Sequence, residues 1–312
     1  MRILITGGFG FIGGRVAQHL ANLGHQITLG TRNNEHCPTW LKTAKVAKTD
    51  WQNFDSLASL CKDIDIIIHA AGINAQDSVL DPHSAHQFNG ITTGHLANIA
   101  AEEGVKRFIY LSTAHVYSSP LRGAIDESTH PINKHPYASS HLEGEDAIRN
   151  VSLRFPIETI IARLSNIYGA PASPNPQCWS LLTNDLCKQA IEMGELHLNT
   201  SGNQKRDFLD MGTATEMLAF LCQMSMSPKK SLTFNIGKGN SKSLFEMAAT
   251  IQNRCQVNFG FTPKIYVNEK NISEDNSDLI FTIDRIRNAG YSPKENEVSE
   301  IDNLLNFCKK HF

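Results

Sequence analysis

A strand followed by a glycine-rich turn near the start of the chain constrains the fold more than any other feature. Residues 3–5 (Ile-Leu-Ile) predict a buried strand, and residues 6–13 continue as Thr-Gly-Gly-Phe-Gly-Phe-Ile-Gly. A segment with the apolar spacing of a helix begins at the last of these glycines. Glycines at such places permit a tight turn, close approach of the backbone to a pyrophosphate, and close packing of helix on strand. The pattern therefore predicts a dinucleotide site formed by Gly7, Gly10, Phe11, Ile12 and Gly13.

The rest of the first half alternates short β-branched runs with helical patterns, which is typical of a parallel sheet with crossover helices. Further strands are predicted at 27–29, 45–47, 64–69, 108–111 and 159–162, and a helix at about 137–150. After Gly169 three prolines mark a loop. Helical patterns then prevail, at 179–193, 215–224 and 244–254, with short strands near Phe234 and Ile265.

We therefore expect an α/β fold, with a Rossmann-type doubly wound parallel sheet and a smaller, mostly helical C-terminal lobe. The dinucleotide-binding domain should span residues 1–168 and the substrate-binding lobe 169–312. Part of the second portion, about 207–240, should return to the sheet.

Composition excludes several classes of function. The 312 residues include 29 basic and 31 acidic side chains, and a net charge of −2 gives no field that would recruit nucleic acid or a membrane. Seven dispersed cysteines without a C-x-x-C pair indicate a reducing compartment. The histidines lack neighbours at metal-ligand spacing, so no metal is expected. A strand that starts at once leaves no room for a cleaved signal, and no apolar run is long enough to span a membrane, so a cytoplasmic protein is expected.

The glycine spacing, G-x-x-G-x-x-G, resembles the extended short-chain dehydrogenase/reductase family, which includes nucleotide-sugar epimerases, dehydratases and 4-ketoreductases. The resemblance covers nearly the whole chain. It extends to His69-Ala70-Ala71-Gly72, to Asn89, to the segment 163–169 (Arg-Leu-Ser-Asn-Ile-Tyr-Gly), and to residues 206–209 and 235–237. It implies that Ala70, Ala71 and Gly72 line the adenine side of the cofactor, and that Asn89 steadies the central helix.

The family's Y-x-x-x-K motif falls on Tyr137 and His141, four residues apart on one helical face. The resemblance implies that Tyr137 exchanges a proton with the reacting oxygen. In the family, the lysine of the motif lowers the pKa of the tyrosine and holds the nicotinamide ribose. In this chain His141 stands at the position of that lysine. A charged imidazole can assist in the same way, although a histidine with its reference pKa of about 6.5 is largely neutral above pH 7. The alternative is a non-catalytic protein, an NADP-binding regulator.

A third catalytic residue comes from residues 111–117 (Leu-Ser-Thr-Ala-His-Val-Tyr), which resemble the family's S-[ST]-x-x-V-Y run. The alignment gives Thr113 the role of hydrogen-bond donor to the substrate oxygen, with Ser112 as the neighbouring alternative. The 4,6-dehydratases carry Asp-Glu directly after this threonine. Here Ala114 and His115 stand there, so dehydration lacks its acid-base pair.

The end of the second strand bears on the choice of cofactor. An acidic residue there would hold the adenosine ribose of NAD, but the position is Gly30, followed by Thr31 and Arg32. A guanidinium and a hydroxyl suit a 2′-phosphate, so NADP is favoured and NAD is the alternative. Arg32 as an ordinary solvated arginine is the competing interpretation. Asp50 matches a family aspartate that contacts the adenine and suits either cofactor.

On the substrate side, Asn166, Arg206 and Arg287 match family positions that hold the diphosphate of a nucleotide sugar, although each arginine could instead form a surface ion pair. Taken together, these residues predict a keto-sugar reductase that uses NADP and Tyr137 as proton donor. An epimerase with bound NAD is the alternative enzyme. The resemblance also leaves room for a homodimer.

Overall fold

The computed structural model of the chain describes residues 1–33, 36–226, 230–268, 278–293 and 297–312. By its internal contacts the chain divides into two compact units. The first consists of residues 1–120, 129–164 and 215–234, and the second of residues 121–128, 165–214 and 235–312. The division into two domains at residue 168 stays a prediction.

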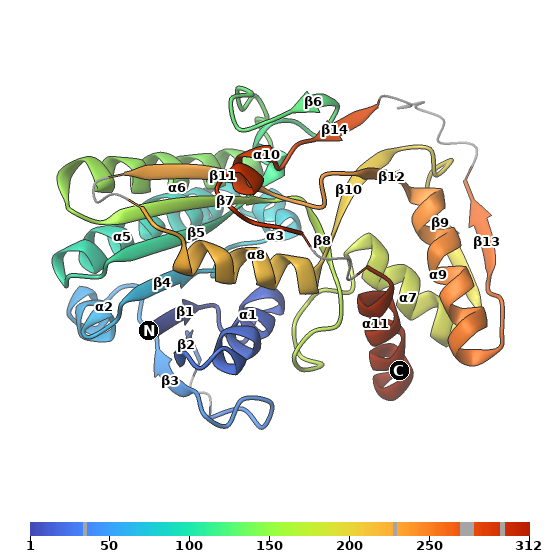
Figure 1. Cartoon of the computed structure of the whole chain (residues 1–312), viewed down its shortest axis with the longest axis horizontal. Coiled ribbons are helices and arrows are strands. Elements are labelled where there is room, and N and C mark those ends of the chain that lie inside the picture. Colours follow the sequence, from blue (N-terminus) through green and yellow to red (C-terminus); the bar gives the residue numbers. More distant parts are fainter. Residues whose placement is uncertain (34–35, 227–229, 269–277, 294–296) are drawn as a thin grey trace. The chain divides into compact units, whose positions relative to one another are not determined.

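The first unit is built on a seven-stranded sheet with the order β11-β7-β5-β4-β1-β2-β3 (Figure 1). Each described pairing from β3 through to β7 is parallel. The order runs outward in both directions from β1 and β4, which is the doubly wound arrangement predicted from the sequence. The strands are β1 (Arg2–Thr6), β2 (Gln26–Thr31), β3 (Lys45–Lys48), β4 (Ile66–His69), β5 (Arg107–Thr113), β7 (Glu158–Leu164) and β11 (Ser231–Ile236).

Helices cover both faces of this sheet, with α1 and α8 on one side and α2, α5 and α6 on the other (Figure 1). Every residue of β4 and β5 is buried, as expected of strands covered on both faces, and the central residues of both strands are apolar or aromatic. One core cluster joins Leu4 and Tyr110 of the sheet to Leu57, Leu96 and Ile148 of the covering helices. The helices are α1 (Phe11–Asn22), α2 (Phe54–Cys61), α3 (Ala75–Leu80), α4 (Pro82–Ala85), a π-helix η1 (His86–Thr92), α5 (Thr93–Glu102), a short 3₁₀ helix η2 (Ala114–Val116), α6 (Pro136–Arg154) and α8 (Met211–Gln223).

The second unit contains three small sheets, so it has more strand than the mostly helical lobe that we expected. Its strands are β6 (Gly123–Ile125), β8 (Asn166–Tyr168), β9 (Glu195–Leu198), β10 (Lys205–Asp210), β12 (Ser241–Ser243), β13 (Lys264–Val267) and β14 (Leu279–Phe281). They pair as β12-β10-β8, β13-β9 and β14-β6. Its helices are α7 (Leu182–Met193), α9 (Leu244–Phe259), α10 (Asp284–Asn288) and α11 (Glu297–His311).

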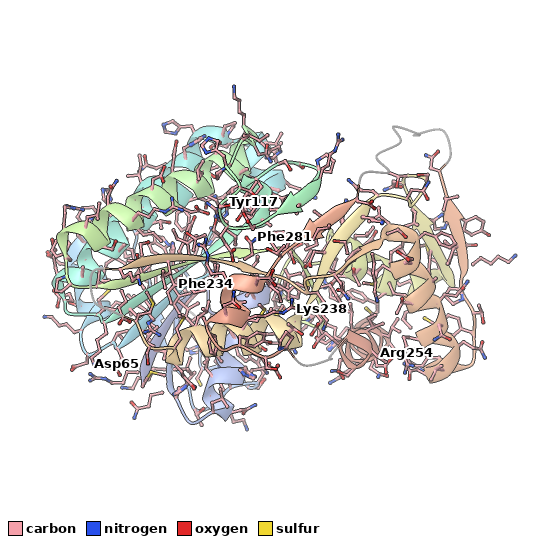
Figure 2. The ribbon with its side chains drawn as sticks, turned by 45° about the horizontal axis from the view of Figure 1, so that its top comes forward. Asp65, Tyr117, Phe234, Lys238, Arg254 and Phe281 are labelled. Carbon is pink, nitrogen blue, oxygen red and sulfur yellow. The ribbon has the colours of Figure 1, made fainter. Side chains whose placement is uncertain are left out.

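The helices α7, α9 and α11 pack around a common core of this second unit. Arg254 of α9, labelled in Figure 2, forms two hydrogen bonds of 2.7 Å with Asp302 of α11. At the start of α9, Ser243 and Glu246 exchange hydrogen bonds as a capping box, which satisfies N–H groups that the helix leaves free.

All seven cysteines are free thiols, as the dispersed spacing predicts. Among the helices that the structure describes, none is both long and apolar enough to cross a membrane. Among the residues that the structure describes, no three or more His, Cys, Asp or Glu side chains are grouped so that they could hold a metal ion.

Candidate active site

The glycine turn has the geometry that a pyrophosphate site requires. Gly7 has a φ of +64°, which favours glycine, and its carbonyl accepts a 2.8 Å hydrogen bond from the Gly10 N–H. A Cβ on Gly13 would collide with the same carbonyl oxygen. Gly10 caps α1 without any side-chain hydrogen bond, so the N–H groups of the first turn, at Phe11 and Ile12, remain available to an anion. The turn therefore fits the phosphates of a dinucleotide.

The segment after β4 lies directly against this turn. A Cβ on Gly7 would approach the Ala71 nitrogen to 2.9 Å and the Ala70 carbonyl to 3.0 Å. Asn89 of the π-helix holds the same segment through two hydrogen bonds to the backbone of Ile73, and its amide also donates to Ser140 of α6 at 3.1 Å. Asn89 thus connects the segment that contains Ala70, Ala71 and Gly72 to the central helix.

At the end of β2 the chain offers no carboxylate. Gly30 lies within the strand, where a Cβ would crowd the Thr49 methyl group at 2.9 Å. Arg32 follows as an exposed side chain and has no ion pair with any described residue. Asp50 lies just beyond β3, half-buried, and accepts a hydrogen bond from the Gln52 N–H. The segment expected to recognise the adenosine ribose therefore has no carboxylate at Gly30 and has, at Arg32, a guanidinium that forms no ion pair with any described residue.

Tyr137 and Thr113 form a hydrogen-bonded pair. Tyr137 is the second residue of α6, and Thr113 is the last residue of β5. Burial raises the pKa of Tyr137 above its ordinary value, while the hydrogen bond with Thr113 acts in the opposite direction. The Thr113 oxygen accepts the His115 N–H at 3.1 Å, which leaves its own proton to donate to the phenol oxygen. Thr113 thus occupies the place that the sequence predicts, whereas the hydroxyl of Ser112 turns to Glu145 at 2.6 Å.

His141 lies beside Tyr137 in a buried environment that favours its neutral form. The two rings meet edge to face, with their centroids 4.6 Å apart. Burial lowers the pKa of His141 to about 4, although the Glu145 carboxylate opposes this shift. Of the two charge states considered from the sequence, burial of this side chain, which is only 6% exposed, favours the neutral imidazole near neutral pH.

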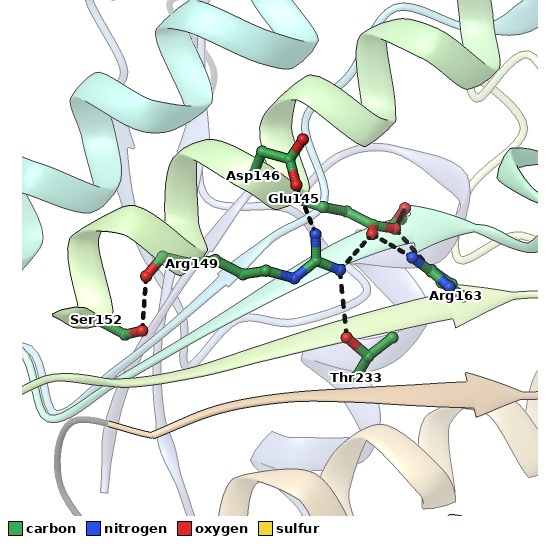
Figure 3. Close-up of polar contacts among 7 residues, drawn as sticks. Glu145, Asp146, Arg149, Ser152, Arg163 and Thr233 are labelled. Carbon is green, nitrogen blue, oxygen red and sulfur yellow. Dashed lines mark hydrogen bonds and ion pairs between the residues drawn. The ribbon is translucent and has the colours of Figure 1, made fainter. Parts of the chain in front are cut away.

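Glu145, one turn further along α6, was missed in the sequence and anchors the helix to the sheet. It is fully buried and forms two hydrogen bonds with Arg163 of β7, at 2.9 and 2.6 Å, and one with Arg149 at 2.8 Å (Figure 3). Arg163, the arginine of the family segment at 163–169, is therefore an internal ion-pair partner. The spacing of four from His141 was the available signal, since it places Glu145 on the same helical face.

We predict that Glu145→Ala destabilises the fold by about 3–5 kcal/mol, because it leaves the buried Arg163 charge without its partner. Burial raises the pKa of Glu145, but the bonds from Arg163 outweigh it and lower the pKa overall. The stabilisation is therefore complete above the unfolded pKa near ~4.3 and is lost as the pH falls through the folded value. Urea unfolding at pH 7 and at acidic pH measures both effects.

Glu143→Ala on the same helix serves as the control, because Glu143 is exposed and its one ion pair with a described residue is with the half-buried His86. Its expected cost is at most about 1 kcal/mol. Equal costs for the two variants at pH 7 would contradict the anchoring role of Glu145.

The substrate-side residues all lie in the second unit. Asn166 of β8 pairs in register with Phe208 of β10, so Asn166 and Arg206 share one face of that sheet. Burial lowers the pKa of Arg206, and its one hydrogen bond to a described residue is with Gln204 at 3.2 Å. The guanidinium of Arg287 in α10 lies 3.5 Å from the Asp284 carboxylate. Arg287 and Arg206 are not joined by a hydrogen bond in the part of the chain that the structure describes. Arg206 is thus a half-buried cation that has no carboxylate partner among the described residues, which leaves its guanidinium available to an anion.

Asp207 and Lys238 organise the loop next to Arg287. The buried Asp207 accepts hydrogen bonds from Ser165 and from the N–H groups of Lys238 and Gly239, and burial raises its pKa to about 6. Lys238, labelled in Figure 2, bonds to Asp210 at 2.9 Å. A Cβ on Gly239 would approach the Arg287 guanidinium to 3.3 Å, so this loop lies next to that side chain.

The chain belongs to the NAD dependent epimerase/dehydratase family, whose sequence profile matches residues 3–237. This confirms the resemblance inferred from the glycine turn and the segments that follow it.

Two curated relatives extend the similarity along the chain. UDP-glucose 4-epimerase of Azospirillum brasilense is 24% identical, over 96% of this chain and 89% of the relative. dTDP-D-glucose 4,6-dehydratase of Mus musculus is 26% identical, over 100% and 89%. The solved UDP-glucuronic acid 4-epimerase from Bacillus cereus, in complex with UDP-glucuronic acid and NAD, has a TM-score of 0.81, is 23% identical and covers 100% of both chains. This likeness establishes the epimerase fold.

Proposed function

We propose that the chain is an NAD(P)-dependent epimerase that inverts a hydroxyl-bearing carbon of a nucleotide-linked sugar. The observation that carries the proposal is the hydrogen-bonded pair of Tyr137 and Thr113. Thr113, at the end of β5, lies at the same edge of the parallel sheet as the glycine turn, which follows β1. Family membership and the named epimerases support epimerisation better than the keto-sugar reductase that the sequence favoured.

In this proposal a bound dinucleotide would supply reversible hydride transfer at the sugar carbon, and the residues of the chain handle the proton. Tyr137 takes the proton of the sugar hydroxyl during oxidation and gives it back during reduction. Thr113 donates a hydrogen bond to the same sugar oxygen, and His141 holds the nicotinamide ribose. Asn166, Arg206 and Arg287 bind the diphosphate. Elimination of water is not part of the proposal, since Ala114 and His115 supply no acid-base pair.

One observation favours a reductase as the second candidate. Burial raises the pKa of Tyr137, and His141 beside it is neutral, so the phenol is a better proton donor than acceptor near pH 7. A reductase needs only the donor, whereas an epimerase needs both forms in turn.

Proton NMR of UDP-glucose and dTDP-glucose, incubated with the chain, separates these functions. An epimerase brings each sugar and its C4 epimer to one equilibrium ratio without net change in the nicotinamide absorbance. A reductase instead consumes NADPH in proportion to an added nucleotide 4-keto sugar. Cofactor binding with neither reaction would favour the non-catalytic regulator.

We further propose that NADP(H) binds more tightly than NAD(H). The 2′-phosphate is remote from the nicotinamide, so this preference is independent of the reaction type. Gly30 provides no carboxylate, and the exposed Arg32 is unpaired among the described residues. The Bacillus cereus epimerase was solved with NAD, which is a property of that protein.

Arg32→Ala should narrow the difference in affinity between the two cofactors by about 1–3 kcal/mol, the value of a charge-assisted contact. Titration calorimetry with NADPH and NADH measures the difference, and Arg122→Ala, an exposed arginine of the second unit, is the control. Equal affinities in the unmodified chain, or a difference that Arg32→Ala leaves unchanged, would favour NAD.

A further inference from the structure

A series of buried hydrogen bonds leads from the strand before the glycine turn to His141. Thr6, the last residue of β1, lies 2.7 Å from His69 Nδ1, and the other ring nitrogen of His69 lies 3.0 Å from the Thr93 hydroxyl. Thr93 also hydrogen-bonds to the Tyr110 hydroxyl. Tyr110 in turn lies 2.8 Å from His141 Nδ1. All five side chains are buried, so their protons have few alternatives.

The direction of each hydrogen bond is assigned from the one proton that each hydroxyl and each neutral imidazole can donate. The Thr6 oxygen accepts the Ala71 N–H at 3.4 Å, so its own proton points to His69 Nδ1. Burial and the neighbouring His141 lower the pKa of His69 to about 3, which favours the neutral ring. If Nδ1 accepts the Thr6 proton, the one ring proton lies on Nε2, and we assign it there. That proton goes to the Thr93 oxygen. The Thr93 proton then has two acceptors, the Tyr110 oxygen and the Phe88 carbonyl oxygen at 3.4 Å, and the series uses the first.

The Tyr110 hydroxyl then has two acceptors to choose from. His141 Nδ1 lies at 2.8 Å, whereas the Asn89 carbonyl oxygen lies at 3.2 Å. The shorter contact favours donation to the imidazole, which leaves the proton of His141 on Nε2. Gly144 makes this approach possible, since a Cβ there would lie 2.8 Å from the Tyr110 oxygen.

The free edge of the His141 ring faces the cofactor side. A Cβ on Gly72 would lie 3.9 Å from His141 Cε1, so that edge points to the segment after β4. The titratable groups around the ring are Tyr110 of β5, Tyr137 and Glu145 of α6, and His69 of β4.

We propose that Tyr110 is a positioning residue that holds His141 as the neutral Nε2–H tautomer, through the hydrogen-bonded series Thr6–His69–Thr93–Tyr110. The imidazole then offers one oriented N–H to the cofactor ribose at the position where the family carries an ammonium group. The role toward the ribose rests on the proposed function, whereas the tautomer does not.

Long-range ¹⁵N–¹H NMR of the full chain labelled in histidine tests the tautomer directly, because protonated and unprotonated ring nitrogens resonate far apart. The chain has 13 histidines, and the signals of His141 are assigned as those that are missing from the spectrum of His141→Lys. We expect Nε2 protonated and Nδ1 unprotonated, without change between pH 8 and 6. Tyr110→Phe should give a mixture of tautomers and weaken NADPH binding about 3- to 10-fold, the value of one hydrogen bond.

Two adjacent threonines provide a matched control. Thr93→Val breaks the series and should also mix the tautomers, whereas Thr92→Val removes only a hydroxyl that bonds to the Gln87 carbonyl and should not. The proposal is overturned by Nδ1–H in the unmodified chain, or by an unchanged His141 spectrum in Tyr110→Phe. Since the spectra need no substrate, they stand even if no sugar is turned over.

Discussion

Tyr137→Phe is expected to lower turnover of a nucleotide sugar by about 10²-fold or more, because it removes the group that exchanges the proton with the sugar oxygen. The fold should be preserved, since the ring remains in contact with His141. Tyr266→Phe, a change at a 42% exposed ring in the second unit, is the control and should leave turnover unaffected. Steady-state kinetics on folded variants gives the comparison.

The pH dependence follows from the raised pKa of Tyr137. Oxidation of the sugar needs the tyrosinate, whose population rises about tenfold per pH unit below the pKa, whereas reduction uses the abundant phenol. Epimerisation should therefore accelerate from pH 7 to 9, and reduction of a keto sugar should stay level. A rate that falls over this range would contradict the role of Tyr137 as the base.

His141→Lys is expected to retain or raise turnover, since it restores a permanent positive charge on the same helical face as Tyr137. If Tyr137→Phe and His141→Ala both turned over a verified substrate as well as the unmodified chain, the family mechanism would not apply here.

Gly10→Val is expected to weaken dinucleotide binding by on the order of 100-fold, which corresponds to about 2.7 kcal/mol. A side chain there occupies the space of the pyrophosphate. The φ of −75° at Gly10 is open to any residue, and a Cβ there would meet the Gly7 carbonyl oxygen at 3.0 Å, a contact that a small shift relieves, in contrast to the collision at Gly13. Calorimetry with NADPH and NADH is the measurement.

Gly13→Val distinguishes lost binding from lost folding. A Cβ on Gly13 collides with the Gly7 carbonyl, so this variant should lower the melting temperature, while Gly10→Val should leave it nearly unchanged. Undiminished cofactor affinity in folded Gly10→Val would remove the glycine turn from the binding site.

The sheet was largely predictable from the sequence, because buried parallel strands are near-continuous apolar runs. The segment Ile64–His69 illustrates this, with the observed strand at Ile66–His69. The helix α5 was missed because it continues from the π-helix without a capping signal and its buried face is mostly small residues, with Leu96 and Ile99 as its larger members. The strands of the second unit are only three to six residues long, too short for a clear alternation.

The site was predictable only where residues share a motif. The spacing of Tyr137 and His141 pointed to one helical face, and the structure brings them together. The bonds of Tyr110 to His141 and of Thr93 to His69 join residues 31 and 24 positions apart, and only the tertiary fold creates them. The sequence already indicated a largely neutral His141 above pH 7, but the further lowering of its pKa by burial could be found only in the fold.

A sugar deuterated at C4 tests the central claim most directly. If the chain is an epimerase whose bound cofactor takes up the hydride and returns it to the same carbon, the inverted nucleotide sugar retains its deuterium at C4, with none lost to water or to added NADPH. Mass spectrometry and proton NMR of the product measure this retention. Loss of the label to solvent, or its stoichiometric appearance on free nicotinamide, would contradict the account.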